Sequence, residues 1–219
     1  VMLGTVADLV PLVDENRTLV ALGLADLPRS ANLGLQALIE QTRYNPAEIT
    51  AGQVGFNLAP RINAAGRLGQ ADLALELLLT TDPGKAQSLA QQLTELNNHR
   101  QTIEAEILQQ ALEAVELTWP PEDKAIVVAG VGWHSGVVGI VASRLVEIYY
   151  RPVVVISLDG TEGHGSARSI PGLNIYTALT QCADCLQGFG GHSGAAGFTI
   201  VADKVDEFRE RICQAVDSM

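Results

Sequence analysis

Apolar residues between positions 83 and 118 recur at steps of three, four and seven, the spacing that places them on one face of an α-helix. Pro83 follows Asp82 and suits a first helical turn, and Trp119-Pro120-Pro121 ends the pattern. One helix of about thirty-five residues would be roughly 50 Å long at 1.5 Å per residue. A helix of that length is typical of a connection between domains, so we expect a domain boundary near Trp119. The repeating positions are Leu89, Leu93, Leu96, Ile103, Ile107, Ala111 and Val115.

The two segments that flank this helix have different patterns. Residues 14–80 show apolar faces of short helices and few strand signals. After the double proline, apolar runs alternate with helical spacing, which predicts an α/β domain with a mixed sheet. The expected strands are 125–129, 152–156, 163–168 and 197–201, and the expected helices are 137–150, 175–186 and 204–216. The expected apolar faces of the first segment are Leu19, Leu22 and Leu27, then Leu35, Leu38 and Ile39.

The composition is that of an ordinary globular protein, with 219 residues and 47% hydrophobic content. No apolar run approaches the roughly 18 residues of a membrane span, and no charged-then-apolar leader opens the chain, so we expect a cytoplasmic protein without a membrane partner. The three cysteines, Cys182, Cys185 and Cys213, are too few for a disulfide framework. Cys182 and Cys185 have the spacing of a zinc site but no second pair, and we expect them to be structural.

The net charge of −11 argues against indiscriminate binding of duplex nucleic acid, because such binders are usually basic. Local binding depends instead on whether the few cations converge. Four arginines lie in or beside glycine-rich motifs: Arg61, Arg67, Arg144 and Arg168.

The pattern Gly-x-His-Ser-Gly-x-x-Gly occurs twice, at 132–139 and at 190–197. The first copy lies between a predicted strand and a predicted helix, so its backbone N–H groups lie at a helix start, where an anion is favoured. His134 and His192 add a donor or a charge. The alternative is that the glycines only permit tight turns and close packing. Because the pattern is repeated, we favour one shared task, the binding of phosphate.

Two further motifs carry arginine. In Gly165-Ser-Ala-Arg-Ser-Ile-Pro-Gly172, strand alternation points Ser166 and Arg168 to the same side of the sheet, where a hydroxyl and a guanidinium suit a phosphate. The alternative for Arg168 is a surface ion pair with a glutamate. Pro60-Arg-Ile-Asn-Ala-Ala-Gly-Arg-Leu-Gly69 surrounds Arg61 and Arg67 with small residues, which allows a ligand or another domain to approach.

An apolar stretch at the start of the chain ends in Asp8, within Gly4-Thr-Val-Ala-Asp-Leu-Val-Pro-Leu12. At a strand end this carboxylate is a candidate ligand for Mn²⁺ or Mg²⁺. The alternative is a helix N-cap or a turn aspartate. No Asp-x-Asp or Asp-His-His cluster occurs in the chain, so its residues do not supply a two-metal site.

Taken together and in this order, the five motifs resemble the RecJ exonucleases of the DHH phosphoesterase family. The resemblance implies a helical end of the DHH catalytic domain at 1–82, a connecting helix at 83–119 and an α/β DHHA1-type domain at 122–217. It implies a 5′→3′ exonuclease of DNA repair and recombination, specific for single-stranded DNA and dependent on Mn²⁺ or Mg²⁺. Implied partners are single-stranded DNA and repair proteins such as a single-strand-binding protein or a helicase.

The resemblance also assigns roles to individual residues. Asp8 matches the last metal-binding aspartate and is implied, with His192, in catalysis. The implied contacts to DNA phosphates are Arg61, Arg67, His134, Ser135, Arg144, Ser166, Arg168, Ser169, Gly190, Gly191, His192, Ser193 and Gly194.

The chain departs from the family pattern because the Asp-x-Asp and Asp-His-His segments of these exonucleases are absent. We therefore expect a fragment of a longer protein, inactive alone. Two alternatives stay open: a binding module for single-stranded nucleic acid without chemistry, and a phosphoesterase that acts on small nucleotides.

Overall fold

The computed structural model describes residues 1–120 and 123–219, which form two compact units, Val1–Gln101 and Thr102–Met219. Pro121, in the predicted helix stop, and residue 122, the predicted start of the second domain, lie outside the described residues. None of the helices in the described part of the chain combines the length and the apolar character that a bilayer crossing requires.

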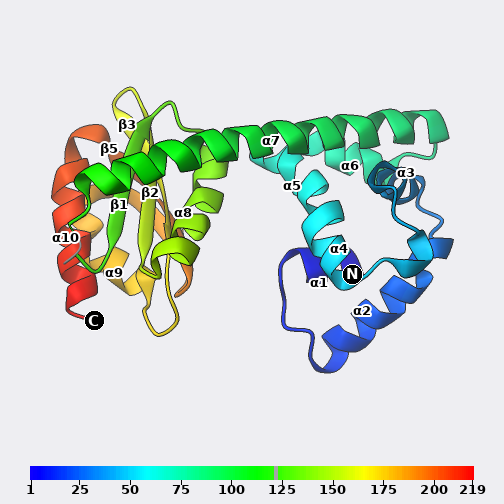
Figure 1. Ribbon diagram of the computed structural model, residues 1–219, viewed down its shortest axis with the longest axis horizontal. Coiled ribbons are helices and arrows are strands. Elements are labelled where there is room, and N and C mark those ends of the chain that lie inside the picture. Colours follow the sequence, from blue (N-terminus) through cyan, green and yellow to red (C-terminus); the bar gives the residue numbers. More distant parts are fainter. Residues whose placement is uncertain (121–122) are drawn as a thin grey trace. The chain divides into compact units, whose positions relative to one another are not determined.

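The first unit is helical, in agreement with its sequence pattern (Figure 1). Its core contains Leu38, Leu58, Leu77 and Leu93, all fully buried. Its elements are α1 (Met2–Ala7), α2 (Asp14–Asp26), η1 (Leu27–Arg29), α3 (Leu33–Thr42), η2 (Pro46–Glu48), α4 (Ala51–Gln53), the π-helical turn η3 (Val54–Leu58), α5 (Ala59–Arg67), α6 (Ala71–Leu79) and the first part of α7 (Pro83–Thr118).

One of the predicted apolar faces is not buried. Leu19 and Leu22 on α2 are 44% and 64% exposed, whereas Leu27, Leu35 and Leu38 are buried as predicted. The side of α2 that packs into the core is represented by Val20 instead.

Helix α7 is continuous over 36 residues, close to the predicted range. Its start is capped by Asp82, whose Oδ1 accepts a hydrogen bond from the backbone N–H of Lys85 at 3.0 Å. The compact units divide within this helix, between Gln101 and Thr102, whereas the sequence placed the boundary near Trp119. The difference arises because the last turns of α7 pack into the second core through Ile107, Ala111 and Val115.

The second unit is built on a five-stranded mixed sheet, as predicted, with the order β1-β2-β3-β5-β4 (Figure 1). The β1–β2 pair is parallel, and every other pair is antiparallel. The strands are β1 (Ile126–Val131), β2 (Val153–Asp159), β3 (Glu162–Arg168), β4 (Leu186–Gly191) and β5 (Ala195–Val201). The helices are α8 (Ser135–Tyr149), α9 (Ile175–Gln181), η4 (Ala183–Cys185), η5 (Ala202–Lys204) and α10 (Val205–Asp217).

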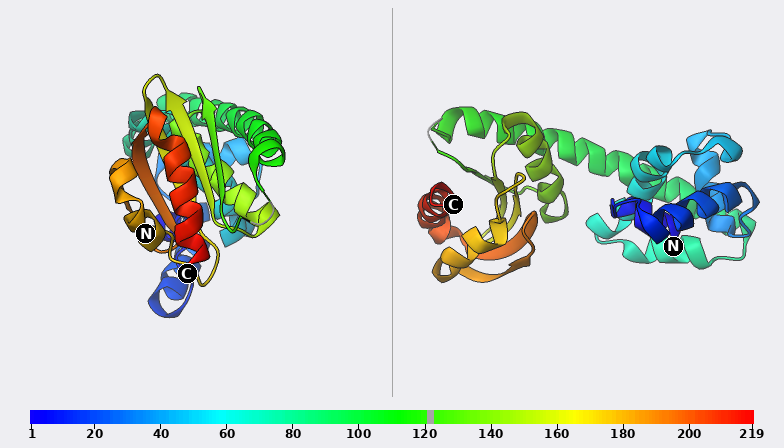
Figure 2. Two further views of the ribbon diagram at one scale, coloured as in Figure 1. Left: turned by 90° about the vertical axis from the view of Figure 1, so that its left-hand side faces the viewer. Right: turned by 90° about the horizontal axis from the view of Figure 1, so that it is seen from below.

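Helices cover the two faces of this sheet in different ways (Figure 2). On one face α9 and α10 pack over apolar residues such as Ile156, Phe198 and Ile200. On the other, called here the α8 face, α8 and the end of α7 cover Val128, Val153 and other residues of β1 and β2. The exposed residues of β4 and β5 lie beyond the strands that α8 covers.

One predicted helix was too long. Helix α9 ends at Gln181 rather than at residue 186, and strand β4 follows it. Three of the six residues in β4 before and at its end are glycines, Gly188, Gly190 and Gly191. Because glycine has low strand propensity and no side chain to show alternation, the sequence pattern did not reveal this strand.

Candidate phosphate-binding site

Strand β3 presents polar side chains on the α8 face. Its buried positions are Gly163, Gly165 and Ala167, so the alternate positions, including Ser166 and Arg168, share the opposite side. Arg168 Nη1 donates to Ser166 Oγ at 2.9 Å and to the carbonyl oxygen of Ala167 at 2.8 Å. Ser166 and Arg168 therefore form one cluster of donors, as the alternation predicted.

Gly139 on α8 lies against this cluster. A Cβ at Gly139 would lie 2.7 Å from Arg168 Nη2 and 2.9 Å from Ser166 Oγ, both closer than real Cβ contacts allow. The missing side chain therefore leaves space between helix and strand for the guanidinium. Gly139 is the last glycine of the first repeated motif, so the structure joins that motif to the Ser-Ala-Arg motif.

The first motif forms the predicted strand-turn-helix connection. Gly132 has φ +75°, and His134 is the N-cap of α8, where its Nδ1 accepts from the backbone N–H of Gly136 at 3.1 Å. Ser135, exposed, is the first residue of the helix. Backbone N–H groups at a helix start favour an anion, which agrees with the sequence interpretation of this copy.

Trp133 anchors the same turn. Its buried indole Nε1 donates to Gln110 Oε1 of α7 at 2.7 Å, and its ring occupies the space beside Gly130. The hydroxyl of Ser157 on β2 donates to the carbonyl oxygen of Trp133. Three contacts from α7, β1 and β2 thus fix the turn that precedes α8.

The second motif has a different backbone. Residues 190–197 form the turn between β4 and β5, where the N–H of His192 donates to the carbonyl oxygen of Ala195 at 2.8 Å. The inference that the two copies are equivalent loops is wrong, because one begins a helix and the other closes a hairpin. They share one local contact: His192 Nδ1 accepts from the backbone N–H of Gly194 at 3.2 Å, as His134 does from Gly136.

The hairpin of the second motif is attached to the end of β3. Arg168 pairs with Ala195 in the sheet register. The N–H of Ser169 donates to the carbonyl oxygen of Gly194, and that of Ile175 donates to the carbonyl oxygen of Ser193, both at 3.0 Å. The structure therefore brings Ser166, Arg168 and Ser169 together with Ser193 and Gly194. One row along the sheet, Gly190 and Gly191 belong to the same hairpin.

Arg144 is engaged in ion pairs. Its guanidinium lies 3.1 Å from Glu147 Oε2 and 3.5 Å from Glu104 Oε1. The hydrogen bond to Glu147 and its charge, followed by Glu104, raise the pKa of Arg144. These carboxylates compensate the charge that the sequence interpretation assigned to a phosphate.

Arg61 and Arg67 lie on α5 in the first unit. Arg61 Nε donates to Thr94 Oγ1 at 3.3 Å and its Nη1 donates to the carbonyl oxygen of Asn57, while burial lowers its pKa. Arg61 thus ties α5 to α7, a packing role that the sequence interpretation did not give it. Arg67, at the end of α5, is exposed.

Asp8 does not end a strand, as the sequence interpretation expected. The apolar stretch before it forms α1, and Asp8 is an exposed residue at the C-cap of that helix. Residues 1–120 and 123–219 contain no group of three or more His, Cys, Asp or Glu side chains arranged to hold a metal ion. A single exposed carboxylate does not fit a Mn²⁺ or Mg²⁺ centre, and we derive no chemical step through a metal.

The cysteines are free thiols, and Cys182 and Cys185 are buried. Burial, followed by the neighbouring Cys185, raises the pKa of Cys182 to about 11. A buried thiol with a raised pKa is a poor nucleophile and a poor metal ligand at neutral pH, in line with the structural role expected for this pair.

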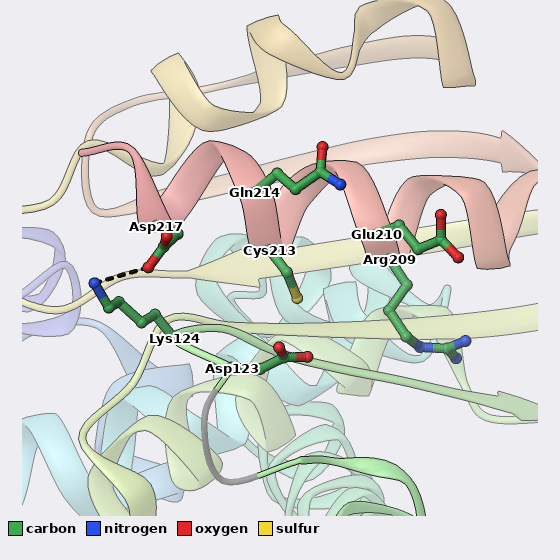
Figure 3. A pocket seen from close by; sticks show the side chains of 7 residues that line it. All are labelled: Asp123, Lys124, Arg209, Glu210, Cys213, Gln214 and Asp217. Atoms are coloured by element: carbon green, nitrogen blue, oxygen red, sulfur yellow. Dashed lines mark ion pairs between the residues drawn. The ribbon is translucent and has the colours of Figure 1, made fainter.

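A pocket of about 420 Å³ lies between α10 and the residues that lead into β1 (Figure 3). Cys213 points into it and donates to the carbonyl oxygen of Ala125 at 3.7 Å, and an ion pair of 2.7 Å joins Lys124 to Asp217. Because Asp123, Glu210 and Asp217 outnumber the two cations of its lining, this pocket does not suit a phosphate.

Comparison with known proteins places the chain. Residues 122–218 match the DHHA1 domain. Over 99% of its length the chain is 46% identical to the single-stranded-DNA-specific exonuclease RecJ of Bacillus subtilis, and over 95% it is 42% identical to that of Thermus thermophilus. It spans 28% and 30% of the lengths of these two relatives.

Solved structures agree with this relationship. The crystal structure of Thermus thermophilus RecJ in complex with Mg²⁺ matches all of the chain at a TM-score of 0.91 and 41% identity, over 34% of that protein. A crystal structure of the exonuclease RecJ bound to manganese matches it at a TM-score of 0.83 and 40% identity, over 54% of that protein.

Proposed function

We propose, on the premise that this chain is a relative of RecJ with a DHHA1 domain at residues 122–218, that it is the DNA-holding part of a single-stranded-DNA-specific exonuclease. The names of the relatives support the substrate, and the chemistry of the site supports recognition through the phosphate backbone.

The observation that carries the proposal is the convergence of Ser166 and Arg168 beside Gly139. A guanidinium offers a planar fork of donors to phosphate oxygens, and a hydroxyl adds a short contact. In the proposal Ser166 and Arg168 hold one phosphate, the 5′ end of the strand. Ser169, Ser193 and the hairpin glycines border this position.

The histidines add donors at two places. His192 in the hairpin is a candidate for a contact close to the reacting phosphate, and His134 with Ser135 is a candidate at the start of α8. Because phosphate contacts carry no sequence information, base preference is weak in this proposal. Arg144, already paired with Glu147 and Glu104, is the weakest of the candidates, and Arg61 and Arg67 belong to a separate part of the path.

Residues 1–82 are assigned in this proposal to the end of the DHH catalytic domain, and the long helix to the connection with the DHHA1 domain. Metal-dependent hydrolysis with Mn²⁺ or Mg²⁺ belongs to the whole protein, supported by the ions of the related structures. Because the described residues offer no metal-holding group, this chain alone is expected to bind but not to hydrolyse. That observation also favours a second candidate, a binding module without chemistry.

Other parts of the proposal concern the cell. Free thiols support a reducing compartment such as the cytoplasm. A function in DNA repair and recombination would bring the protein together with a single-strand-binding protein or a helicase.

Fluorescence anisotropy tests the proposal with a 5′-phosphorylated single-stranded oligonucleotide, its 5′-hydroxyl counterpart and a matched duplex, each at low and moderate salt. We expect tighter binding of the phosphorylated single strand and weaker binding at higher salt. Equal affinity for the duplex would contradict single-strand selection, and no binding to any of the three would contradict the DNA-holding role. Added Mn²⁺ with a hydrolysis readout separates the two candidate functions in the whole protein.

A further inference from the structure

We propose that His164 is a second contact for backbone phosphate, and that a single strand follows β3 with one phosphate near Ser166 and Arg168 and the adjacent one near His164. This inference rests on the proposed function and names residues of β3 that extend the same site. The histidine attracted no attention in the sequence because it lies outside both repeated motifs.

The register of the sheet places His164 in line with the phosphate cluster. Alternation along β3 puts His164, Ser166 and Arg168 on the same face, and His164 is exposed. Positions two residues apart in a strand are separated by about 6.6 Å, from a rise of about 3.3 Å per residue. Stacked duplex strands rise only about 3.4 Å per nucleotide, so this separation suits the phosphates of an extended, unstacked strand.

The neighbouring strands leave this line open on one side. Ser166 pairs with Gly197 of β5, which pairs with Gly190 of β4, and both glycines are exposed. A Cβ at Gly190 would meet no atom within 4 Å, and one at Gly197 would meet only a carbonyl oxygen at 3.8 Å. Sugar and phosphate can therefore approach the donors of β3 without meeting a side chain in this row.

The other side of the line is closed. His164 pairs with Ser157 of β2, which is buried and donates to the carbonyl oxygen of Trp133. The turn before α8 therefore covers the sheet next to His164, while Gly139 of α8 lies next to Ser166 and Arg168. A strand that enters from the β5 side meets donors at a wall.

Charge limits the length of this line. The next residue of β3 on the same face, Glu162, is exposed and pairs with Asp159 at the end of β2. Two carboxylates there repel phosphate. The row of donors thus ends at His164, and we expect two adjacent phosphates along β3 rather than three.

The test combines alanine variants with neutral linkages in the DNA. Single-stranded 5′-phosphorylated oligonucleotides carry one methylphosphonate at successive positions from the 5′ end, and anisotropy gives Kd for the unchanged chain, Arg168→Ala and His164→Ala. We expect His164→Ala to weaken binding of unmodified DNA about 3- to 10-fold, as loss of one hydrogen bond would. One specific methylphosphonate should abolish that effect, because the phosphate charge that His164 contacts is then already removed.

His99→Ala is the matched control, since His99 is an exposed histidine on α7 in the other unit, and we expect it to leave Kd unchanged. The inference is overturned if His164→Ala binds all oligonucleotides like the unchanged chain, or if its effect couples to a linkage that is not adjacent to the phosphate coupled to Arg168. Loss of the Arg168 effect as well would overturn the proposed function itself, and a chain that binds no single strand would overturn both.

Discussion

The guanidinium of Arg168 occupies space that a Cβ at Gly139 would fill, so a glycine on α8 determines where the arginine of β3 can lie. The two residues come from different motifs and from different elements. Their contact joins a helix glycine to a candidate ligand donor, and it makes the position of the arginine sensitive to one methyl group.

Gly139→Ala should separate stability from binding. Alanine gains roughly 1 kcal/mol of helix propensity over glycine. The atoms it would meet, Arg168 Nη2 and Ser166 Oγ, end side chains that can rotate away. We therefore expect unchanged or slightly higher stability in urea denaturation, with affinity for single-stranded DNA lowered about 10-fold, as for loss of one charged hydrogen bond.

Gly66→Ala on α5 is the control for this change, because a Cβ there would meet nothing within 4 Å. It should raise stability by a similar amount and leave binding unchanged. Full DNA affinity in Gly139→Ala would show that the position of Arg168 has no part in binding.

Arg168→Ala should weaken binding of all sequences alike and reduce the salt dependence. Each phosphate contact on a single strand contributes about 0.7 to the slope of log K against log salt. A titration series over several salt concentrations measures this slope. Arg211→Ala on α10, which packs on the opposite face of the sheet, should change neither quantity. An unaltered slope in Arg168→Ala would return this residue to a structural ion pair.

Much of the second unit could be predicted because its apolar residues report their surroundings directly. Val153, Val154 and Val155 form a continuous apolar run, since β2 is buried on both faces. The same reasoning failed for Asp8, because a short apolar stretch such as residues 4–7 suits a helix or a strand equally.

The identical letters of the two motifs also concealed their difference. After Gly136 the residues Val137 and Val138 continue at helical spacing, whereas after Gly194 the chain alternates buried and exposed residues in β5. Flanking pattern, not the motif, decides between a helix start and a hairpin. The Gly139–Arg168 contact depends on how α8 packs on β3, which a single sequence does not encode locally.

Trp133→Phe should destabilise the second unit. The change removes the donor to Gln110 Oε1 and leaves that amide oxygen beside an apolar ring. We expect a loss of about 1–3 kcal/mol in the free energy of unfolding. Chemical denaturation of Trp133→Phe, Gln110→Leu and the double variant measures the coupling, which should be near zero only if the hydrogen bond contributes nothing.

The thiols predict a loss of stability in alkali. Burial raises the pKa of Cys182 from 9.0 to about 11, and burial with Asp123 raises that of Cys213 to about 11. The folded chain thus keeps these protons to higher pH than the unfolded chain. Their contribution is complete below pH 9 and declines as the pH rises through about 11.

Thermal melts between pH 8 and pH 11 measure this decline. Cys182→Ala should flatten the profile, with at most about 2–3 kcal/mol per thiol at stake from a shift of about two pKa units. A profile of the same steepness in Cys182→Ala would mean that other groups cause the alkaline loss.

The backbone bonds to Nδ1 of His134 and His192 also settle where a neutral ring carries its proton. A nitrogen that accepts from Gly136 or Gly194 has no hydrogen of its own, so the hydrogen resides on Nε2. Two rings in unlike backbones are thereby set to the same tautomer, each with its N–H directed away from its own turn. Such rings act as hydrogen-bond donors without being charged, which lets a strongly acidic chain of net charge −11 address an anion at neutral pH.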